Sequence, residues 1–440
     1  MQLSPTVLTE LAGRYKFLKT PAASGPPAQR EPAVIAAVSE MLSTIERGGM
    51  DAVLEYARTL DHPTGGVVEL DRATIDAAGD RLSPELRAAL EVGAERTRAF
   101  AREQRAHLSD FETELIPGLV TGCRYLPVER VGAYLPAGRF PLLASAFMTV
   151  NVAKVAGVET VLACTPPQRD GQADPAVLYA AAISGADRVY LLGGVQALAA
   201  MAFGLLGEQP VDMLVGAGNA YVAEAKRQLF GRVSIDLLAG PSEVAVIADD
   251  SADVRLVAAD LLGQAEHGPT SPAGLVTTSE TFGLAVIEEV DRQLAGLSTA
   301  EIAGPAWHDY GSVTWAQDLD TAVALMDDFA PEHLEIQTRD DDEYFRRLRN
   351  YGSLFIGQWS TVAYSDKGMA GTNHVLPTAG GARHSAGLSV SRFLKPLTYQ
   401  KVSRQATPAL ADPVDVISSY ETMAAHRATA TLRQELYPEQ

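Results

Sequence analysis

The sequence predicts an α/β protein in which parallel sheets are covered by helices. From residue 130 onward, short apolar runs alternate with longer segments of helical periodicity, at the spacing of strand–helix–strand units. The chain has 440 residues, which is too long for one compact core, so two or three domains are expected. The sequence shows no tandem repeat or low-complexity segment that would indicate a different architecture.

The elements follow one another in a regular order. The first 110 residues are expected to be mainly helical, and 83–108 is the clearest helical run. The β-rich runs lie at 158–167, 187–194, 211–218, 242–250 and 273–280. The helical segments that follow them lie at 175–186, 196–204, 219–231, 251–268 and 282–296. Ser251 or Asp253 can cap the fourth of these helices. The last 60 residues are predicted as helix and turn, ending in the helical run 420–436.

Composition limits the class of protein. Hydrophobic residues make up 47% and charged residues 21%, as in a globular enzyme. The net charge of −19 and the absence of a basic stripe argue against nucleic acid and anionic membrane surfaces as partners. The two cysteines, Cys123 and Cys164, are far apart, which excludes a disulfide framework and gives no support to a thiolate zinc site. No signal peptide or membrane span is predicted, so a cytoplasmic location is expected.

Gln264 and His267 are three residues apart at the end of an apolar helix, so they share one face of it. A histidine in a last helical turn is also favoured by the helix dipole alone, which is a purely structural explanation. A metal site would need two further oxygen or nitrogen ligands from elsewhere in the chain.

Glu332 and His333 are an adjacent acid and base that follow Pro331. A histidine beside a glutamate can act as a general base near neutral pH, and a glutamate can activate water. Adjacent residues of a helix do not face each other, so a shared site requires irregular chain or a substrate between the two side chains. A solvated helix start is the alternative, and the residues alone do not decide between them.

Two further segments contain histidines whose roles are not decided by the residues alone. The stretch YSDKGMAGTNHVLPT, residues 364–378, is either a surface turn or one wall of a site. Glu421 and His426, five residues apart on a helix, are about 140° out of line and also suit an exposed polar face. A dinucleotide fingerprint is incomplete, because Tyr221 stands where a third glycine belongs after VGAG.

Taken together, segments along nearly the whole chain from about residue 125 resemble those of the histidinol dehydrogenases and their catabolic relatives. The matching segments are VERVGAYLP, AKVAGVETV, GGVQALAAMAFG, GNAYVAEAKR, AGPSEVAVIAD, ADLLGQAEHG, APEHLEIQT, GTNHVLPT and FLKPLTYQ. Many segments in the right order make the resemblance specific, although no single one of them would.

The resemblance implies a four-electron oxidation. A primary alcohol becomes a carboxylate in two hydride transfers to NAD, and the aldehyde stays bound between them. It also implies one zinc per subunit, with Gln264, His267 and Asp366 as ligands and His426 supplied by the C-terminal tail of the other subunit of a homodimer. Such a mixed nitrogen and oxygen set can hold zinc and leave room for a substrate.

The resemblance also gives the remaining residues their roles. His333 is similar to the base that takes the alcohol proton, and Glu332 to the residue that activates water against the aldehyde. The other matches are substrate contacts at Ser242, His374 and Glu421, and dinucleotide contacts at Tyr134, Gln196 and Asn219. A zinc hydrolase that works without NAD and a non-catalytic binding protein are the alternatives from other classes.

The fold implied by the resemblance is two Rossmann-like parallel-sheet units with helical N- and C-terminal segments, in an intertwined dimer. Clusters of proline and glycine near 21–27 and 377–381 are the expected hinges. The expected domains are an N-terminal arm 1–31, a discontinuous α/β domain of 32–130 and 236–376 with the catalytic and zinc residues, a dinucleotide-binding domain 131–235, and a helical dimerisation tail 377–440.

The chain departs from the usual pattern of the histidine-pathway enzymes at two places. YLPAGRFPLLASAFMT stands for YVPGG, and SDKGMAGTNH has one extra residue before GTNH. Counting from Trp359 gives Asp366 as the ligand and counting back from His374 gives Lys367, which is a poor metal ligand. Arg139 and Lys367 near the pocket would favour an anionic alcohol such as dihydroxypropanesulfonate (sulfopropanediol) over cationic histidinol. Both side chains pointing to solvent, with histidinol as substrate, is the alternative.

Overall fold

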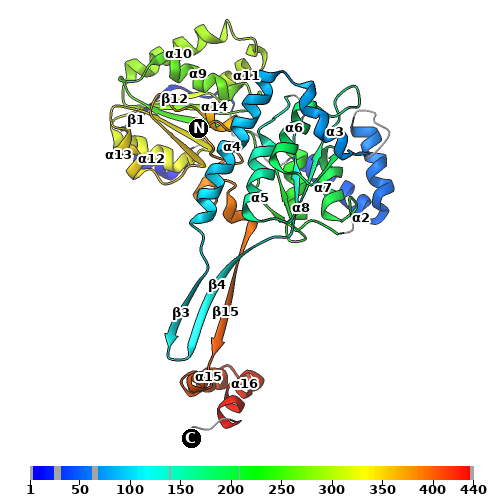
Figure 1. Ribbon diagram of the computed structural model, residues 1–440. Helices are drawn as coiled ribbons and strands as arrows, with labels where there is room; N and C mark the ends of the chain where they lie inside the picture. The colour runs from blue at the N-terminus through cyan, green and yellow to red at the C-terminus, as the bar shows by residue number, and fades with distance from the viewer. Residues whose placement is uncertain (1–2, 24–30, 62–67, 138–139, 208, 437–440) are drawn as a thin grey trace.

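The structure is a computed structural model that describes residues 3–23, 31–61, 68–137, 140–207 and 209–436. Two six-stranded sheets each form the centre of an α/β lobe, and a three-stranded sheet leaves the body as a long arm that carries the last helices (Figure 1). Every helix among the described residues is too short or too polar to cross a lipid bilayer.

Lobe 1 is built on a sheet with the order β2-β7-β6-β5-β8-β9. Its strands are β2 (Val68–Glu69), β5 (Arg130–Tyr134), β6 (Thr160–Thr165), β7 (Arg188–Leu191), β8 (Met213–Val215) and β9 (Ser234–Ile235). Strands β5 to β9 are parallel, and β2 is antiparallel to β7. The helices are α2 (Pro32–Leu60), α3 (Arg72–Ala77), α4 (Pro84–Ala106), α5 (Val152–Ala156), α6 (Pro175–Ser184), α7 (Gly194–Ala202) and α8 (Ala220–Leu229). One buried apolar cluster lies on each face of the sheet, as continuous apolar strands require.

Lobe 2 is built on a sheet with the order β1-β12-β11-β10-β13-β14. Its strands are β1 (Tyr15–Lys19), β10 (Val244–Ala248), β11 (Ala273–Thr277), β12 (Ser312–Ala316), β13 (His333–Gln337) and β14 (Ser353–Ile356). On one face lie α9 (Val254–Ala265), α10 (Glu280–Leu294) and α11 (Ala300–Tyr310), and on the other α1 (Pro5–Glu10), α12 (Leu319–Phe329) and α13 (Asp341–Arg347). Asp253 is the residue that caps α9, since its carboxylate accepts the N–H of Arg255.

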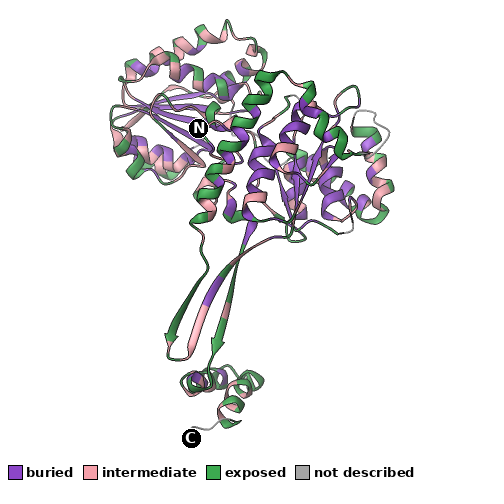
Figure 2. Cartoon of the chain, in the orientation of Figure 1, coloured by how far each residue is buried: buried purple, intermediate pink, exposed green. Residues whose placement is uncertain are grey.

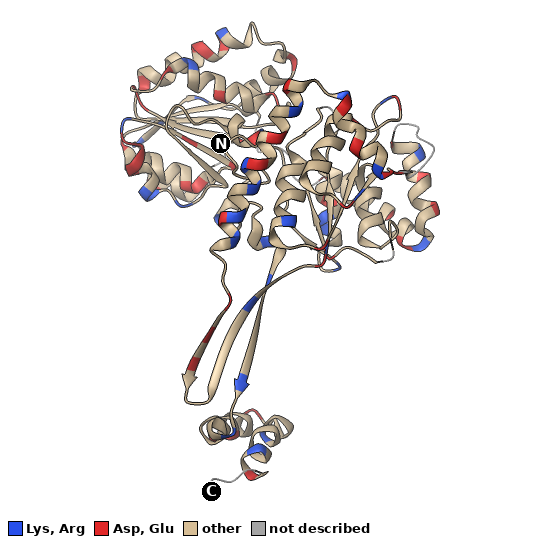
Figure 3. Ribbon diagram, in the orientation of Figure 1, with Lys and Arg blue, Asp and Glu red and all other residues tan. Residues whose placement is uncertain are grey.

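The arm consists of β3 (Phe111–Ile116), β4 (Leu119–Pro127) and β15 (Leu394–Val402), all antiparallel. Helices α15 (Thr407–Tyr420) and α16 (Ala424–Leu436) follow at its outer end (Figure 1). Figure 2 shows that most of the arm and its helices are exposed or half-buried, unlike the sheets of the lobes. Acidic and basic residues are interspersed along the chain of both lobes (Figure 3).

The strand–helix alternation predicted from residue 130 is confirmed, and so is the α/β class. The packing differs from the expected grouping of residues 32–130 with 236–376, because α2 lies against α7 and α8, and α4 against α5 and α6. Strand β1, expected in a separate N-terminal arm, completes the sheet of lobe 2. The expected helical tail also contains strand β15. Which sheet a helix covers depends on tertiary packing, which local periodicity does not encode.

Candidate active site

The amino ends of strands β10 and β13 bring together several residues that were expected to do chemistry. Val244 and His333 pair across these parallel strands, so the segments just before the two strands lie side by side. Ser242 and Glu243 precede β10, and Glu332 precedes β13. The adjacent acid and base therefore stand at the start of a buried strand, and the alternative of a solvated helix start is wrong.

The carboxyl group of Glu332 is buried and accepts two hydrogen bonds on one oxygen. The hydroxyl of Ser242 donates to Oε2 at 2.7 Å, and the N–H of Glu243 donates to the same oxygen at 2.9 Å. Burial raises the pKa of Glu332 to about 8, although both hydrogen bonds favour the charged form, and the negative charge of Asp366 adds to the rise. A carboxyl group with its pKa near the working pH is suited to proton transfer with water.

The imidazole of His333 presents one free nitrogen to the site. Its Nδ1 lies 3.0 Å from the backbone carbonyl of Glu243, which can only accept, so the proton is assigned to Nδ1. The other nitrogen, Nε2, is buried, has no hydrogen-bond partner in the described part of the chain, and lies 4.0 Å from Oδ1 of Asp366. Burial lowers the pKa of His333, while Asp366 opposes that effect. The ring is therefore held neutral, with a lone pair on Nε2.

Asp366, the last residue of α14 (Val362–Asp366), faces the end of α9. Its Oδ2 lies 3.6 Å from Nε2 of His267. Gln264 is buried in the last turn of α9, and both polar atoms of its amide lack a hydrogen-bond partner among the described residues. A buried amide without a partner is costly unless a ligand satisfies it. His267 and Asp366 thus bring together a nitrogen and an oxygen of the kinds that bind metal cations, and the amide of Gln264 could supply a further ligand.

The segment 364–378 connects this donor set to lobe 1. After Asp366 the chain turns at Gly368, where φ is 77°. A Cβ at that position would lie 3.1 Å from the backbone oxygen of Gly93 on α4, so a glycine serves both the turn and the close approach. The Gly-Met-Ala stretch therefore lies at the contact between the two lobes, and the segment is a wall of the site rather than a free surface turn.

Two further residues that were expected to contact substrate flank Asp366. The Nδ1 of His374 lies 3.2 Å from the backbone oxygen of Asp366. Burial lowers the pKa of His267 and of His374; the positive charge of Lys367 lowers both further, and Asp366 opposes it. Lys367 itself is exposed, so its charge stands at the edge of the site. Arg139 lies outside the described residues.

The residues that were expected to contact the dinucleotide lie along the carboxyl edge of the sheet in lobe 1. Tyr134 ends β5, and its hydroxyl oxygen accepts the N–H of Gly194 at 3.1 Å. Gln196 is buried in the first turn of α7, and its Nε2 donates to Oδ2 of Asp61 at 3.2 Å. Asn219 caps α8. In doubly wound sheets, ligands bind at this carboxyl edge.

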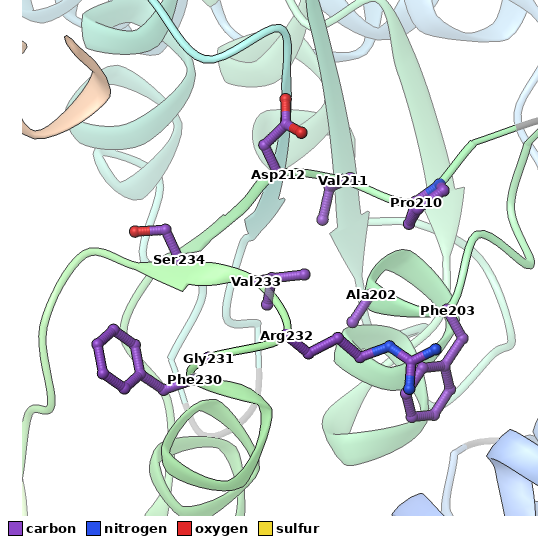
Figure 4. A pocket seen from close by; sticks show the side chains of 10 residues that line it. All are labelled: Ala202, Phe203, Pro210, Val211, Asp212, Phe230, Gly231, Arg232, Val233 and Ser234. Carbon is purple, nitrogen blue, oxygen red and sulfur yellow. The ribbon is translucent and has the colours of Figure 1, made fainter. Parts of the chain in front are cut away.

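Two hollows lie at opposite ends of this sheet. The hollow at the carboxyl edge has a volume of about 700 Å³, and Asp61 and Pro166 are among its lining residues. The other, at the amino edge, has a volume of about 460 Å³ (Figure 4). There Arg232 packs over the ring of Phe203 and pairs with Glu46. The carboxyl-edge hollow is therefore the one that lies beside the expected dinucleotide contacts.

Glu421 and His426 are not brought to this site within one chain. Glu421 follows α15 and His426 lies on α16, both exposed at the outer end of the arm (Figures 1 and 2). The same two helices and the turn between them carry exposed apolar side chains, namely Val416, Ile417, Tyr420, Met423, Leu432 and Leu436. The arm thus carries two polar candidates and an uncovered apolar surface away from the lobes.

Sequence reasoning missed two acids that shape the sites. Glu243 is buried, and its Oε1 accepts the N–H of Glu332 at 3.3 Å and of Ala379 at 2.9 Å. Burial and the neighbouring Glu332 raise the pKa of Glu243 to about 7. Asp61 also accepts the N–H of Gly193 at 3.1 Å, which places it at the start of α7. The sequence did contain a signal for Glu243, because this acid stands directly before an apolar strand. No comparable signal in the sequence pointed to Asp61.

Comparisons with known proteins agree with this architecture. The family model described as histidinol dehydrogenase matches residues 26–434. The chain is 45% identical over 406 residues to "Histidinol dehydrogenase homolog 1" of Mesorhizobium japonicum, covering 92% of this chain and 81% of that one. It is 43% identical to the "Sulfopropanediol 3-dehydrogenase" of Ruegeria pomeroyi, covering 91% and 92%.

A solved structure supports the same assignment. The crystal structure of histidinol dehydrogenase from Elizabethkingia anophelis superposes with a TM-score of 0.89 at 31% identity, covering 94% of this chain and 95% of that one. Both the sequence match and the fold extend over nearly the whole chain. The protein therefore belongs to the histidinol dehydrogenase family, NAD-dependent oxidoreductases that oxidise an alcohol in two steps.

Proposed function

We propose that this protein oxidises a small anionic primary alcohol, such as dihydroxypropanesulfonate, through a bound aldehyde to a carboxylate, using NAD and one zinc per subunit. The observation that carries the substrate class is Lys367, which is exposed beside Asp366 and whose positive charge reaches both His267 and His374. An ammonium at the edge of the site repels a cationic alcohol and attracts a sulfonate or carboxylate. Arg139 is proposed as a second contact to the anion.

Zinc would be held by Gln264, His267 and Asp366 together with the partner subunit's His426. The orphaned amide of Gln264 and the approach of His267 to Asp366 support this set. Within the described part of one chain no three His, Cys, Asp or Glu side chains gather as a metal site, and the proposed set has one amide and one ligand from another subunit. When bound, zinc supplies a Lewis acid that polarises a substrate oxygen.

His333 is proposed as the base of both oxidation steps. Its Nε2 takes the hydroxyl proton while the substrate carbon loses a hydride, so the alcohol becomes an aldehyde and the ring becomes an imidazolium. The nicotinamide accepts the hydride in each step. The carbonyl of Glu243, 3.0 Å from Nδ1, keeps the ring in the tautomer that leaves Nε2 free to take the proton.

Glu332 is proposed to activate water between the two steps. Its carboxylate takes a proton from water as the water oxygen adds to the aldehyde carbon, and the carbonyl oxygen takes back the proton that His333 gained in the first step. The product is the hydrate that loses the second hydride, and His333 is again free to act as base. Ser242 and the backbone N–H of Glu243 hold one oxygen of this carboxylate, so the other oxygen is the one that faces water. His374, which lies 3.2 Å from the backbone of Asp366, is proposed as a further substrate contact.

The dinucleotide is placed at the carboxyl edge of lobe 1, against Tyr134, Gln196 and Asn219. The hollow of about 700 Å³ at this edge supports the placement. The unpartnered Oε1 of Gln196, buried among the described residues, is available to accept a hydrogen bond from the cofactor. Two buried free cysteines and the use of NAD support a cytoplasmic location.

A homodimer is part of the proposal, because the residues expected to complete the site lie at the far end of the arm. Glu421 and His426 would reach the site of a second copy, and the exposed apolar side chains of α15 and α16 would be covered there. Burial of such a surface is a strong driving force for association.

Histidinol is the second candidate substrate. Glu421 favours it, because a carboxylate can hold the ammonium group of a cationic alcohol, and the structural relative from Elizabethkingia anophelis carries that activity in its name. The relative from Ruegeria pomeroyi favours the sulfonate. Membership of the family is therefore compatible with either substrate, and the positive charge of Lys367 favours the anionic alcohol.

The deciding experiment is a side-by-side assay of NADH formation with dihydroxypropanesulfonate and with histidinol. We expect the sulfonate to have the larger kcat/KM, and Lys367→Met to lower it about tenfold while leaving histidinol unchanged or improved. Lys395→Met, which removes an exposed lysine from the arm, is the control. If the wild type instead has the larger kcat/KM for histidinol, and Lys367→Met does not raise that value, histidinol is the substrate.

A further inference from the structure

The face of strand β13 that continues from His333 is polar throughout, although the strand is completely buried. His333, Glu335 and Gln337 alternate along β13 and therefore project to the same side. Leu334 and Ile336 point to the other side, where they join the apolar cluster with α12. All three polar side chains are at most 2% exposed. A row of buried polar groups of this kind requires partners.

The partners come from α9 and from the start of α14. The amide Nε2 of Gln337 donates to Oδ2 of Asp260 at 2.8 Å and to Oε2 of Glu335 at 3.0 Å. The hydroxyl of Thr361 donates to Oδ1 of Asp260 at 2.9 Å. The N–H of Val362 donates to Oε1 of Glu335 at 3.2 Å. Four oxygens of two carboxyl groups are thus each contacted by a donor.

Glu335 and Asp260 form a carboxyl pair in which Glu335 is fully buried. Burial raises its pKa well above the usual value, and the charge and hydrogen bond of Asp260 raise it further. Two carboxylates this close cannot both ionise at modest cost. A proton shared between the two carboxyl groups therefore stabilises the pair, and Asp260 also accepts hydrogen bonds from Gln337 and Thr361.

Each element that meets in this network leads to the candidate active site. Glu335 lies two residues after His333 on β13, and Asp260 lies one turn before Gln264 on α9. Thr361 is the N-cap residue of α14, whose last residue is Asp366. The network therefore ties together the three elements that present the base and two of the proposed zinc ligands. Hydrogen bonds behind a site fix the orientation of the groups that do the chemistry.

We propose that Asp260, Glu335 and Gln337 are positioning residues, which fix the relative placement of β13, α9 and α14 behind the active site. The inference rests on the proposed function for its zinc ligands. A network that served stability alone would be replaceable by apolar side chains of similar size without a specific effect on chemistry.

The test compares three variants with one control. Glu335→Gln keeps the size of the side chain and one oxygen that can accept from Val362, but its NH2 group cannot accept from Gln337, so kcat is expected to fall less than in Glu335→Leu. Glu335→Leu removes the contacts with Gln337, Val362 and Asp260. We expect it to lower kcat about ten- to a hundredfold and to speed the release of zinc to a chelator by a similar factor. Thr361→Val removes a single bond and is expected to have a smaller effect of the same kind, without loss of the fold.

The control is Ile336→Ala, which weakens the same strand from its opposite face. It is expected to lower the melting temperature while kcat and the rate of zinc release stay near wild type. The KM for NAD, whose proposed contacts lie in lobe 1, is expected to stay constant in every variant. An effect of Glu335→Leu and Thr361→Val on melting temperature alone, as in the control, would overturn the proposal.

The two proposals fail in different ways. A wild-type protein that holds no zinc contradicts the metal site, but kcat can still be compared for Glu335→Leu and Ile336→Ala with any alcohol that yields NADH. That comparison decides the positioning role by itself.

Discussion

Replacing Glu332 with glutamine should separate the two oxidation steps. Glutamine keeps an oxygen that can accept from Ser242 and from the N–H of Glu243, so the local structure is preserved. It cannot take a proton from water, and loss of a general base typically costs about 10²- to 10⁴-fold in rate. We therefore expect the oxidation of aldehyde to fall by that factor while the oxidation of alcohol to aldehyde persists.

The pKa of about 8 for Glu332 adds a quantitative expectation for the wild type. The base acts as its carboxylate, which makes up roughly a tenth of the molecules at pH 7 and roughly nine tenths at pH 9. The rate of aldehyde oxidation should therefore rise about tenfold between pH 7 and pH 9. Glu332→Gln should remove this rise together with the activity.

Stopped-flow measurement of NADH formation in a single turnover provides the assay. The wild type should give two equivalents of NADH per alcohol, and Glu332→Gln should give one fast equivalent followed by a slow second one. Direct addition of the aldehyde isolates the second step. Two fast equivalents from the variant would refute the role of Glu332 in water activation.

Three further predictions concern other buried groups. His333→Ala should lower both steps about 10²- to 10⁴-fold while NAD affinity, measured by fluorescence titration, stays constant; an unchanged kcat would contradict its role as base. Glu243 has a folded pKa of about 7, so the metal-free protein should lose stability as pH rises from about 4.5 to 7, by about 3 kcal/mol. Because Glu243→Gln lacks this loss, its free energy of unfolding in urea should exceed that of the wild type at pH 8 and equal it at pH 4.5. An equal excess at both pH values would disprove the coupling between protonation of Glu243 and stability. Lys226→Met leaves the buried carboxylate of Asp236 without its ion-pair partner, so thermal unfolding should show a free energy of unfolding lower by about 3–5 kcal/mol. Removal of the exposed Lys401 should change that free energy little.

Local patterns predicted the parts of the fold that are local. The alternation of strands and helices from residue 130 is visible because each element carries its own periodicity. The arm was not visible, because β15 pairs with β4 more than 260 residues earlier in the chain and most of its residues are not buried on either face. The position of α2 was also missed, since an amphipathic helix shows that it packs but not against which sheet.

The candidate site was predictable to a similar degree. The spacing of Gln264 and His267 suggested a shared helix face, and the structure adds Asp366 opposite His267. The burial of Glu335 was not anticipated, because an isolated acid is normally exposed. The signal was present in the segment HLEIQ, where polar and apolar residues alternate with the period of a strand. A polar face on a strand that is covered on both sides marks a network rather than a solvent-facing surface.

The arm also has a genetic consequence. In the proposed dimer each catalytic centre is assembled from the lobes of one copy and the tail of the other. Two inactive alleles, one with a defect in a lobe, such as His333→Ala, and one with a defect in the tail, such as His426→Ala, should then complement each other when they are expressed together. A mixed pair of subunits contains one centre with both defects and one with neither, so extracts should regain up to about a quarter of wild-type activity if subunits pair at random.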